Sequence, residues 1–164
     1  MALSHYDEKI LKLFLDMSGV SYDDYSVNFY KAVHKKEDHY CASYDPLFIY
    51  EIGKTYEEDI DTDTSKSCGK GLHVGTPLFV AEYGRGWPDV AFLEVRVENN
   101  HLVIPDRYRE GKFRTSQLTV LREVPASELI VKIRKVANEQ KAEIDKYVDK
   151  LSKDLGCKTN SRRC

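Results

Sequence analysis

Val90-Ala91-Phe92-Leu93-Glu94-Val95-Arg96-Val97-Glu98 is the stretch with the clearest secondary-structure pattern in this chain. From Leu93 onward, apolar and charged side chains alternate with a period of two, which predicts a strand with one apolar and one polar face. Shorter apolar segments on both sides are also expected to be strands: 29–33, 47–50, 72–74, 101–104 and 113–124. Because these strands follow one another with a single short helix between them, we expect an α+β fold with a mostly antiparallel sheet.

Three helices are expected around this block of strands. Residues 2–18 carry apolar side chains at helical spacing and end at Gly19, a common helix stop. A short helix runs from the N-cap Thr76, through Pro77 at its first position, to Tyr83. Residues 126–155 predict one long C-terminal helix with a weak apolar seam. We expect that seam to pack on its own domain, with pairing to the first helix or a homodimer through 126–155 as alternatives.

The length of 164 residues favours one domain. We place it at residues 1–155, with a core at 29–124, followed by a disordered basic tail at 156–164. A hydrophobic content of 41% suffices for one modest core, and a net charge of −2 gives no overall attraction to nucleic acid or to a membrane. No apolar run long enough to span a bilayer and no secretory pattern is present, so a cytoplasmic location is expected.

Metal binding is not expected. The four cysteines (Cys41, Cys68, Cys157 and Cys164) form no CxxC pair and are expected to be free thiols, and the five histidines lack HxxxH spacing. The acidic segment 57–67 lacks the glycine and terminal glutamate of a calcium loop, so we expect a solvated loop there.

The glycine-rich segment Cys68-Gly69-Lys70-Gly71-Leu72-His73-Val74-Gly75-Thr76 is the strongest candidate for a site. Its glycines permit positive φ and close backbone approach, and successive N–H groups there, with the helix after Thr76, can bind an anion. His73 can orient a ligand or act as a general acid or base. The alternative is a structural turn whose imidazole bonds a nearby carbonyl. The candidate ligand-binding residues are Gly69, Gly71, His73, Gly75, Thr76, Tyr83, Lys112 and Arg114.

Two other groups of residues are weaker candidates for a functional site. A nucleophilic Cys68 paired with His73 would need both side chains on one side of the turn, so a structural Cys68 is favoured. Basic and aromatic residues mix between Tyr83 and Arg114, as in single-strand nucleic-acid sites, but interspersed acids favour an ordinary mixed surface.

The order of several short motifs resembles an uncharacterised domain family. Tyr50-x-x-Gly53-x-x-Tyr56 is followed by Cys68-x-x-Gly71-Leu72-His73, by a helix with Pro, Ala and Tyr, and by the strand Leu93-Glu94-Val95. This C-x-x-G-[LF]-H pattern resembles segments of phage rIIB-like proteins and of small phage or bacterial open reading frames, over about residues 29–124. The resemblance implies a common fold and a phage or mobile-element origin, but no activity.

A second resemblance is to ADP-ribosyltransferase-type NAD-binding domains. It is based on Gly71-Leu72-His73-Val74, the helix with Ala81 and Tyr83, and the strand 93–95. The resemblance implies NAD as cofactor, with a His or Arg on the first core strand, where this chain has Tyr30 and Lys31. The catalytic candidates it implies are His73, Tyr83, Glu94 and Glu123, with Gln117 as a further position.

Three functions therefore remain open from the sequence. The leading expectation is an accessory domain of phage or mobile-element type that binds a nucleotide, another anion or a host protein near His73. An NAD-dependent ADP-ribosyltransferase-like enzyme is the alternative. The third is a protein-interaction module that acts through residues 126–155.

Overall fold

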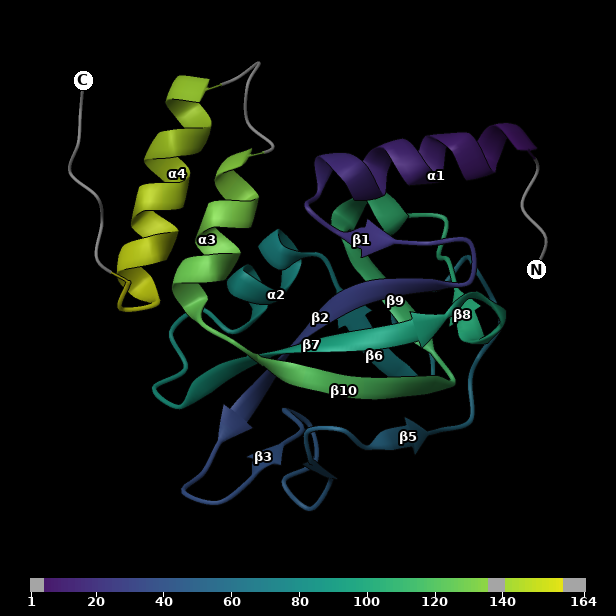
Figure 1. The fold of residues 1–164 in the computed structure, drawn as a ribbon, viewed down its shortest axis with the longest axis horizontal. Coiled ribbons are helices and arrows are strands. Elements are labelled where there is room, and N and C mark those ends of the chain that lie inside the picture. The colour runs from purple at the N-terminus through teal and green to yellow at the C-terminus, as the bar shows by residue number, and fades with distance from the viewer. Residues whose placement is uncertain (1–4, 136–140, 158–164) are drawn as a thin grey trace.

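The computed structural model describes residues 5–135 and 141–157, and these form an α+β fold, as predicted (Figure 1). The helices are α1 (His5–Met17), α2 (Pro77–Tyr83), α3 (Ala126–Lys135) and α4 (Lys141–Asp154), with short 3-10 turns at Asn99–His101 and Tyr108–Glu110. The strands are β1 (Ser21–Tyr22), β2 (Ser26–Lys35), β3 (Tyr40–Cys41), β4 (Ile49–Tyr50), β5 (Thr55–Glu57), β6 (Leu72–Gly75), β7 (Val90–Glu98), β8 (Leu102–Val103), β9 (Lys112–Thr115) and β10 (Gln117–Val124).

The described strands pair antiparallel in the order β5-β10-β7-β2-β6-β9-β8. β2 pairs with β7 along nine positions, from Ser26 to His34. Its contact with β6 is much shorter, since Tyr30 opposite Gly75 is the single registered pair. The sheet therefore has two parts, β5-β10-β7-β2 and β6-β9-β8, which are joined at this pair.

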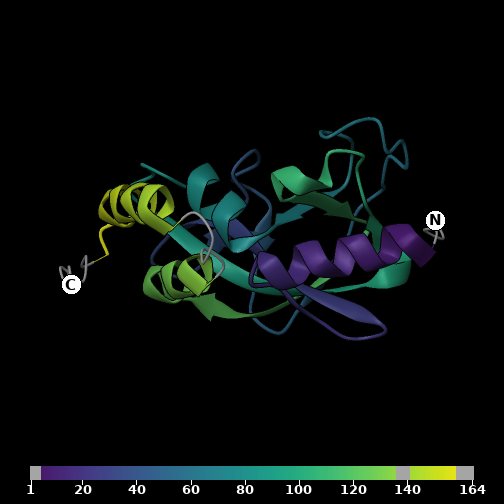
Figure 2. The same cartoon turned by 90° about the horizontal axis from the view of Figure 1, so that it is seen from above.

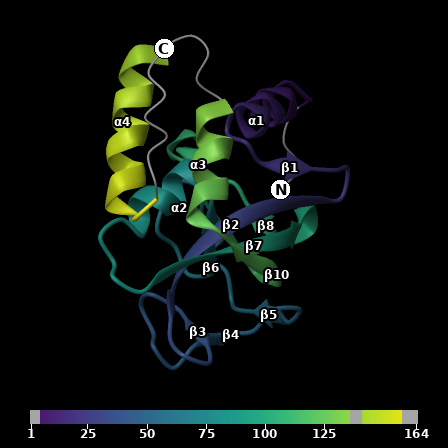
Figure 3. The same cartoon turned by 60° about the vertical axis from the view of Figure 1, so that its left-hand side comes forward.

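In the views of Figures 1 and 3 the helices lie above β10, and β3 and β5 lie below it. Figure 2 shows α1 along one end of the strands, and α3 and α4 side by side at the other end. Of the four helices that the structure describes, none is both long and apolar enough to cross a membrane.

Successive side chains of β2 point to opposite faces of the strand and contribute to two separate hydrophobic clusters. Phe29 and Val33 lie in a cluster with Leu11 and Leu15 of α1, whereas Tyr30 and Ala32 lie in a second cluster under α2 and α3. This is the period of two that a strand buried on both faces requires.

The end of α1 and the start of α2 agree with their sequence signals, whereas the expected first residues of α1 lie outside the described part of the chain. Gly19 has φ +73, and the N–H groups of Gly19 and Val20 donate to Asp16 and Leu15, which is the bonding pattern of a Schellman motif. The Thr76 hydroxyl accepts from the N–H of Phe79 at 3.3 Å, which confirms the N-cap. Between the expected strands 29–33 and 47–50 the structure adds a short strand, because Tyr40 and Cys41 pair with the end of β2.

The prediction of one strand over 113–124 is wrong. The chain leaves β9 at Ser116 and enters β10, and the two strands lie in different parts of the sheet. Ser116 donates its N–H to His101 O at 3.0 Å and accepts from the N–H of Glu58 at 2.9 Å. These two bonds lie outside the β9 and β10 ladders. The apolar positions change phase at this break, since Phe113 is odd-numbered whereas Leu118, Val120 and Val124 are even-numbered. One uninterrupted strand would have placed Phe113 on the opposite face from the other three.

The single helix expected over 126–155 is also wrong. α3 and α4 form an antiparallel hairpin (Figures 1 and 3), whose buried contacts include Ile130, Ile133, Val148 and Leu151, together with Ala81 of α2. The apolar side chains of this segment therefore pack within their own domain, as expected. The seam positions Ala137 and Gln140, and residues 158–164 of the tail, lie outside the described residues. A homodimer through this segment stays a prediction.

A fully buried arginine organises the acidic loop, residues 58–67. Arg114 is on β9, and its guanidinium donates to the backbone carbonyls of Asp61 at 2.7 Å, Lys66 at 2.6 Å and Asp63 at 2.5 Å. Hydrogen bonds from a cation are stronger than neutral ones, and the planar guanidinium fits three carbonyls at once. The loop is therefore fixed against the sheet, although it has no regular secondary structure.

We predict that Arg114→Lys lowers the free energy of unfolding by about 3 kcal/mol, because a lysine cannot reach three carbonyls and would leave buried acceptors unpaired. Urea denaturation followed by circular dichroism measures this loss. Arg107→Lys is the matched control, since the side chain of Arg107 is 77% exposed and lies 3.9 Å from Glu110. Equal stability of the two variants would contradict the assigned role of Arg114.

Candidate ligand-binding site

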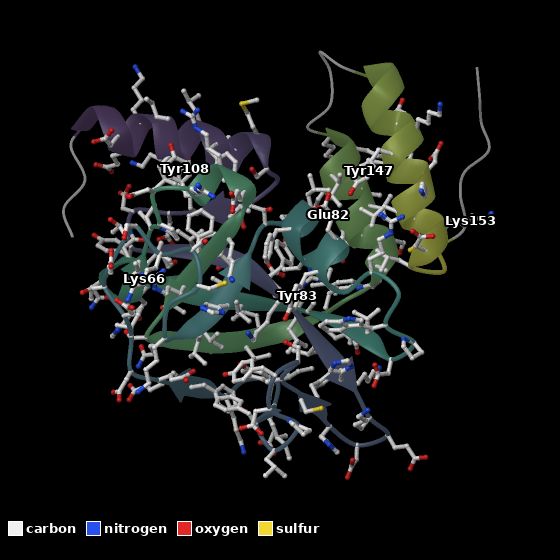
Figure 4. The ribbon with its side chains drawn as sticks, turned by 180° about the vertical axis from the view of Figure 1, so that it is seen from behind. Lys66, Glu82, Tyr83, Tyr108, Tyr147 and Lys153 are labelled. Atoms are coloured by element: carbon white, nitrogen blue, oxygen red, sulfur yellow. The ribbon has the colours of Figure 1, made fainter. Side chains whose placement is uncertain are left out.

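A cavity of about 70 Å³ lies where β2 and β6 diverge beyond the Tyr30–Gly75 pair. We call it the Lys31 cavity. It is lined by Tyr30, Lys31, Ala32, Ser43, Tyr44, His73, Val74, Phe79, Val80, Tyr83 and Lys112. The lining residues come from β2, β6, α2, β9 and the segment before β4, so distant parts of the sequence meet there. Figure 4 shows Tyr83 on the side of α2 away from α4, whereas Glu82 points toward Tyr147.

Lys31 is a buried lysine without a carboxylate partner among the described residues. It is 7% exposed, its Nζ donates to the carbonyl oxygen of His73 at 2.7 Å, and the ring of Tyr50 lies 5.5 Å away. Burial lowers the pKa of Lys31, Glu58 raises it and nearby Lys112 lowers it, and the net value is about 8. A substantial fraction of this amine is therefore neutral near physiological pH.

Lys35, four residues along the same strand, shows the usual arrangement of a strand lysine. Its side chain is 50% exposed, and its Nζ lies 3.0 Å from a carboxylate oxygen of Glu123, which raises the pKa of Lys35. Buried lysines are normally paired with an acid. Lys31 is an exception to that rule, and it lies at a cavity.

His73 agrees in part with both interpretations of the glycine-rich segment, the structural turn and the ligand site. Its Nε2 donates to the carbonyl oxygen of Gly69 at 2.8 Å, as the structural reading expected, and its ring also lines the cavity. Burial lowers the pKa of His73, as do the cations Lys112, Lys31 and Arg114, whereas the bond to Gly69 raises it. Because Nε2 must carry a hydrogen to bond a carbonyl, the neutral ring keeps Nδ1 as an acceptor.

Hydroxyl and amine groups complete the lining. The hydroxyls of Ser43 and Tyr83 lie 3.0 Å apart, and the hydroxyl of Tyr44 donates to Glu58 at 3.5 Å. Lys112 donates to the Cys68 sulfur at 2.6 Å. The exposed Cys68 thus has Lys112 as its partner, and the ring of His73 is bonded to Gly69 instead.

The glycines of the segment 68–76 have packing reasons for their presence. A Cβ on Gly69 would lie 3.0 Å from the Arg114 guanidinium, and one on Gly75 would lie 2.6 Å from the ring of Phe79. Of the three glycines between residues 69 and 75, Gly71 has positive φ, at +139. The N–H of Thr76 is bonded to the carbonyl of Gly111 at 2.9 Å. Ligand binding by these backbone groups stays a prediction.

The structure brings together some predicted site residues and separates others. His73, Tyr83 and Lys112 line one cavity, whereas Arg114 holds the acidic loop. The acidic candidates for catalysis do not line the cavity. Glu94 accepts from Arg122 at 2.7 Å. Glu123 pairs with Lys35 and accepts from Tyr40 at 2.8 Å, and Gln117 donates to Glu57 at 2.6 Å.

Sequence reasoning missed Lys31, Ser43 and Tyr44 as site residues. The sequence does indicate that Lys31 is unusual, because it is the single charged residue inside the apolar run Phe29-Tyr30-Lys31-Ala32-Val33. A lysine at such a position on a strand with two buried faces must either be paired or border a cavity. Ser43 and Tyr44 lie in an irregular segment, and nothing in their local sequence indicates where that segment folds.

A larger cavity, of about 230 Å³, lies on the other face of α2. Its lining is mainly apolar and comes from several helices, with Phe14, Met17, Phe79 and Ile133 among its residues. We place the candidate site in the smaller cavity because that one gathers the titratable side chains with altered pKa values.

Cys41, Cys68 and Cys157 are free thiols, and Cys164 lies outside the described residues. Within the described part of the chain, no cluster of three or more His, Cys, Asp or Glu side chains is arranged to hold a metal ion.

We predict that Lys31→Met increases the free energy of unfolding at pH 7 by about 1–3 kcal/mol, because a buried ammonium is replaced by an apolar chain of similar length. The unfolded chain holds the Lys31 proton up to about pH 10.5, and the folded chain releases it near pH 8. Wild-type stability therefore rises between these pH values, and its deficit relative to the variant shrinks.

Urea denaturation of both proteins from pH 7 to pH 10.5 measures this difference. Lys35→Met is the control on the same strand, since Lys35 is exposed and paired. A stability difference between wild type and Lys31→Met that does not change with pH would contradict the assigned state of Lys31.

The chain matches a protein family that has no assigned activity. No curated protein and no solved structure matches the chain. A domain of unknown function, DUF7666, matches residues 27–132, which include every strand from β3 to β10, nearly all of β2, and the whole Lys31 cavity. The chain therefore belongs to the DUF7666 family.

Proposed function

We propose that this domain binds a small anionic ligand, one that carries a phosphate or carboxylate group, in the Lys31 cavity. The observation that carries the proposal is the charge of the lining. Lys31 and Lys112 contribute two amines, and among the described residues no Asp or Glu lines the cavity. Clefts lined by charge of one sign attract ligands of the opposite sign.

The electrostatics of His73 support the same proposal. Lys112, Lys31 and Arg114 each lower its pKa, so three cations act on one half-buried imidazole. An anion in the cavity would reduce the repulsion among these groups and favour the protonated form of Lys31. The hydroxyls of Ser43 and Tyr83 bond each other, so one of the two keeps a free O–H as a neutral donor beside the amines.

The volume of the cavity limits the size of the ligand. Sites that enclose drug-sized molecules have volumes of about 300–1,000 Å³, well above the value of about 70 Å³ here. A small acid or a single phosphate group matches the enclosed space. A nucleotide would place its phosphate inside and leave its base outside, over the exposed ring of Tyr83.

The ADP-ribosyltransferase-like alternative has weaker support. His73 and Tyr83 lie together, but Glu94 and Glu123 are bonded to other side chains away from the cavity. A phage or mobile-element role, binding to a host protein and a cytoplasmic location stay predictions. The anion proposal depends on none of them.

We expect phosphate, pyruvate or AMP to raise the thermal midpoint in a concentration-dependent way, because each would bind the folded state alone. Comparison of AMP with adenosine isolates the contribution of the phosphate, and NAD tests the larger ligand. Isothermal titration then gives the affinity, which should fall as the pH rises through about 8, where Lys31 loses its charge.

Lys112→Gln should weaken binding of the effective ligand about tenfold or more, since it removes one of the two amines. Lys70→Gln is the matched control, because Lys70 precedes β6, the strand that pairs with β9, but its Nζ faces Asp59 at 3.5 Å, outside the cavity. If no anion shifts the midpoint, or if both variants behave alike, the proposal is wrong.

A further inference from the structure

We propose that the Lys31 amine condenses with the carbonyl group of a small anionic aldehyde or 2-oxo acid and holds it as an imine. This inference rests on the proposed anion site and names the class of compound that would bind there. It assigns to Lys31 a covalent role in addition to its charge.

The position of Lys31 supports this role. Lys31 lines the cavity, and within the described residues its Nζ is held by one neutral acceptor, the carbonyl oxygen of His73 at 2.7 Å. No carboxylate in the described part of the chain forms an ion pair with it, unlike the neighbouring Lys35. An amine that nucleophilic chemistry can use must be reachable, unpaired and partly deprotonated.

The state of the amine meets the third requirement. Burial lowers the pKa of Lys31 to about 8, whereas an exposed lysine has a pKa near 10.5. At pH 7.5 the neutral fraction of Lys31 is then on the order of 100-fold greater than that of an exposed lysine. The aromatic ring of Tyr50 on the other side of the Lys31 side chain contributes to this burial.

The reaction balances without an oxidant or a reductant. The nitrogen lone pair of Lys31 attacks the carbonyl carbon, a C–N bond forms, and a proton moves from nitrogen to oxygen to give a carbinolamine. That oxygen takes a second proton from a donor in the cavity, the C–O bond breaks and water leaves, while the nitrogen lone pair forms the C=N bond of a protonated imine. Return of the remaining N–H proton to the donor gives the neutral imine and restores the donor. The hydroxyls of Tyr83 and Ser43, 3.0 Å apart, and the imidazole of His73 line the same cavity and can transfer these protons.

The second amine gives a reason for an anionic carbonyl compound. Lys112 lines the cavity as well, and it stays available as a cation when Lys31 becomes an imine. A carboxylate beside the carbonyl, as in a 2-oxo acid, can thus be bound by Lys112 while its carbonyl meets Lys31. Neutral ketones lack this second interaction.

The test is reductive trapping of the full-length protein with pyruvate or glyoxylate and sodium borohydride at pH 7.5, followed by mass spectrometry of the intact chain and of its peptides. We expect one reduced adduct, mapped to Lys31 and formed at least tenfold faster than at any other lysine. Acetone, which lacks the carboxylate, should label Lys31 at least tenfold more slowly than pyruvate.

Lys31→Arg is the matched variant, because it keeps a positive charge and cannot form an imine. It should lose the specific adduct. Its affinity for lactate, which resembles pyruvate but lacks the carbonyl, measures separately how far the substitution alters the anion site. Lys70→Gln should be labelled at Lys31 like the wild type.

The outcomes separate the two proposals. Absence of the adduct, or labelling spread evenly over exposed lysines, overturns the imine. Thermal shifts with lactate and phosphate then decide the anion site by themselves. If shifts occur without an adduct, the anion site stands and the covalent role fails. If neither occurs, both fail.

Discussion

The buried guanidinium of Arg114 is the interaction on which the rest of the site depends. Its three carbonyl partners lie in the acidic loop, and the main chain of Gly69 packs against the guanidinium itself. The carbonyl of Gly69 then fixes the ring of His73. One side chain on β9 thereby positions a loop, a turn and a histidine that come from an earlier part of the chain.

The same region concentrates positive charge. Arg114 satisfies its donors with backbone oxygens, Lys31 does so with one carbonyl, and Lys112 faces a thiol. Each of these cations is held without a direct carboxylate partner among the described residues. Such an arrangement costs stability in the free protein, and a bound anion would offset part of that cost. Sites shaped for ligands commonly show this conflict with stability.

The geometry of the sheet explains why the cavity is where it is. β2 is long because it is buried on both faces, and it follows β7 for most of its length. β6 meets it at Tyr30 and Gly75 alone, where the missing side chain of Gly75 lets Phe79 and Gly111 approach. Past this point the strands separate. The space between them is covered by α2, whose start is fixed by the Thr76 cap.

Local sequence determined the elements whose signals are local. The alternation in Val90–Glu98, the Thr76-Pro77 start of α2 and the Gly19 stop of α1 each predicted their element, because strand period, capping and positive φ act over a few residues. The tertiary structure decided where the chain breaks at Ser116, that 126–155 folds as a hairpin, and that Lys31 is buried. Each of these depends on partners far along the chain: His101 and Glu58 for Ser116, Ala81 for the hairpin, and His73 and Tyr50 for Lys31. The sequence predicted His73, Tyr83 and Lys112 as site residues, and these three line one cavity, but the buried Lys31 beside them became visible only when β2 and β6 were brought together.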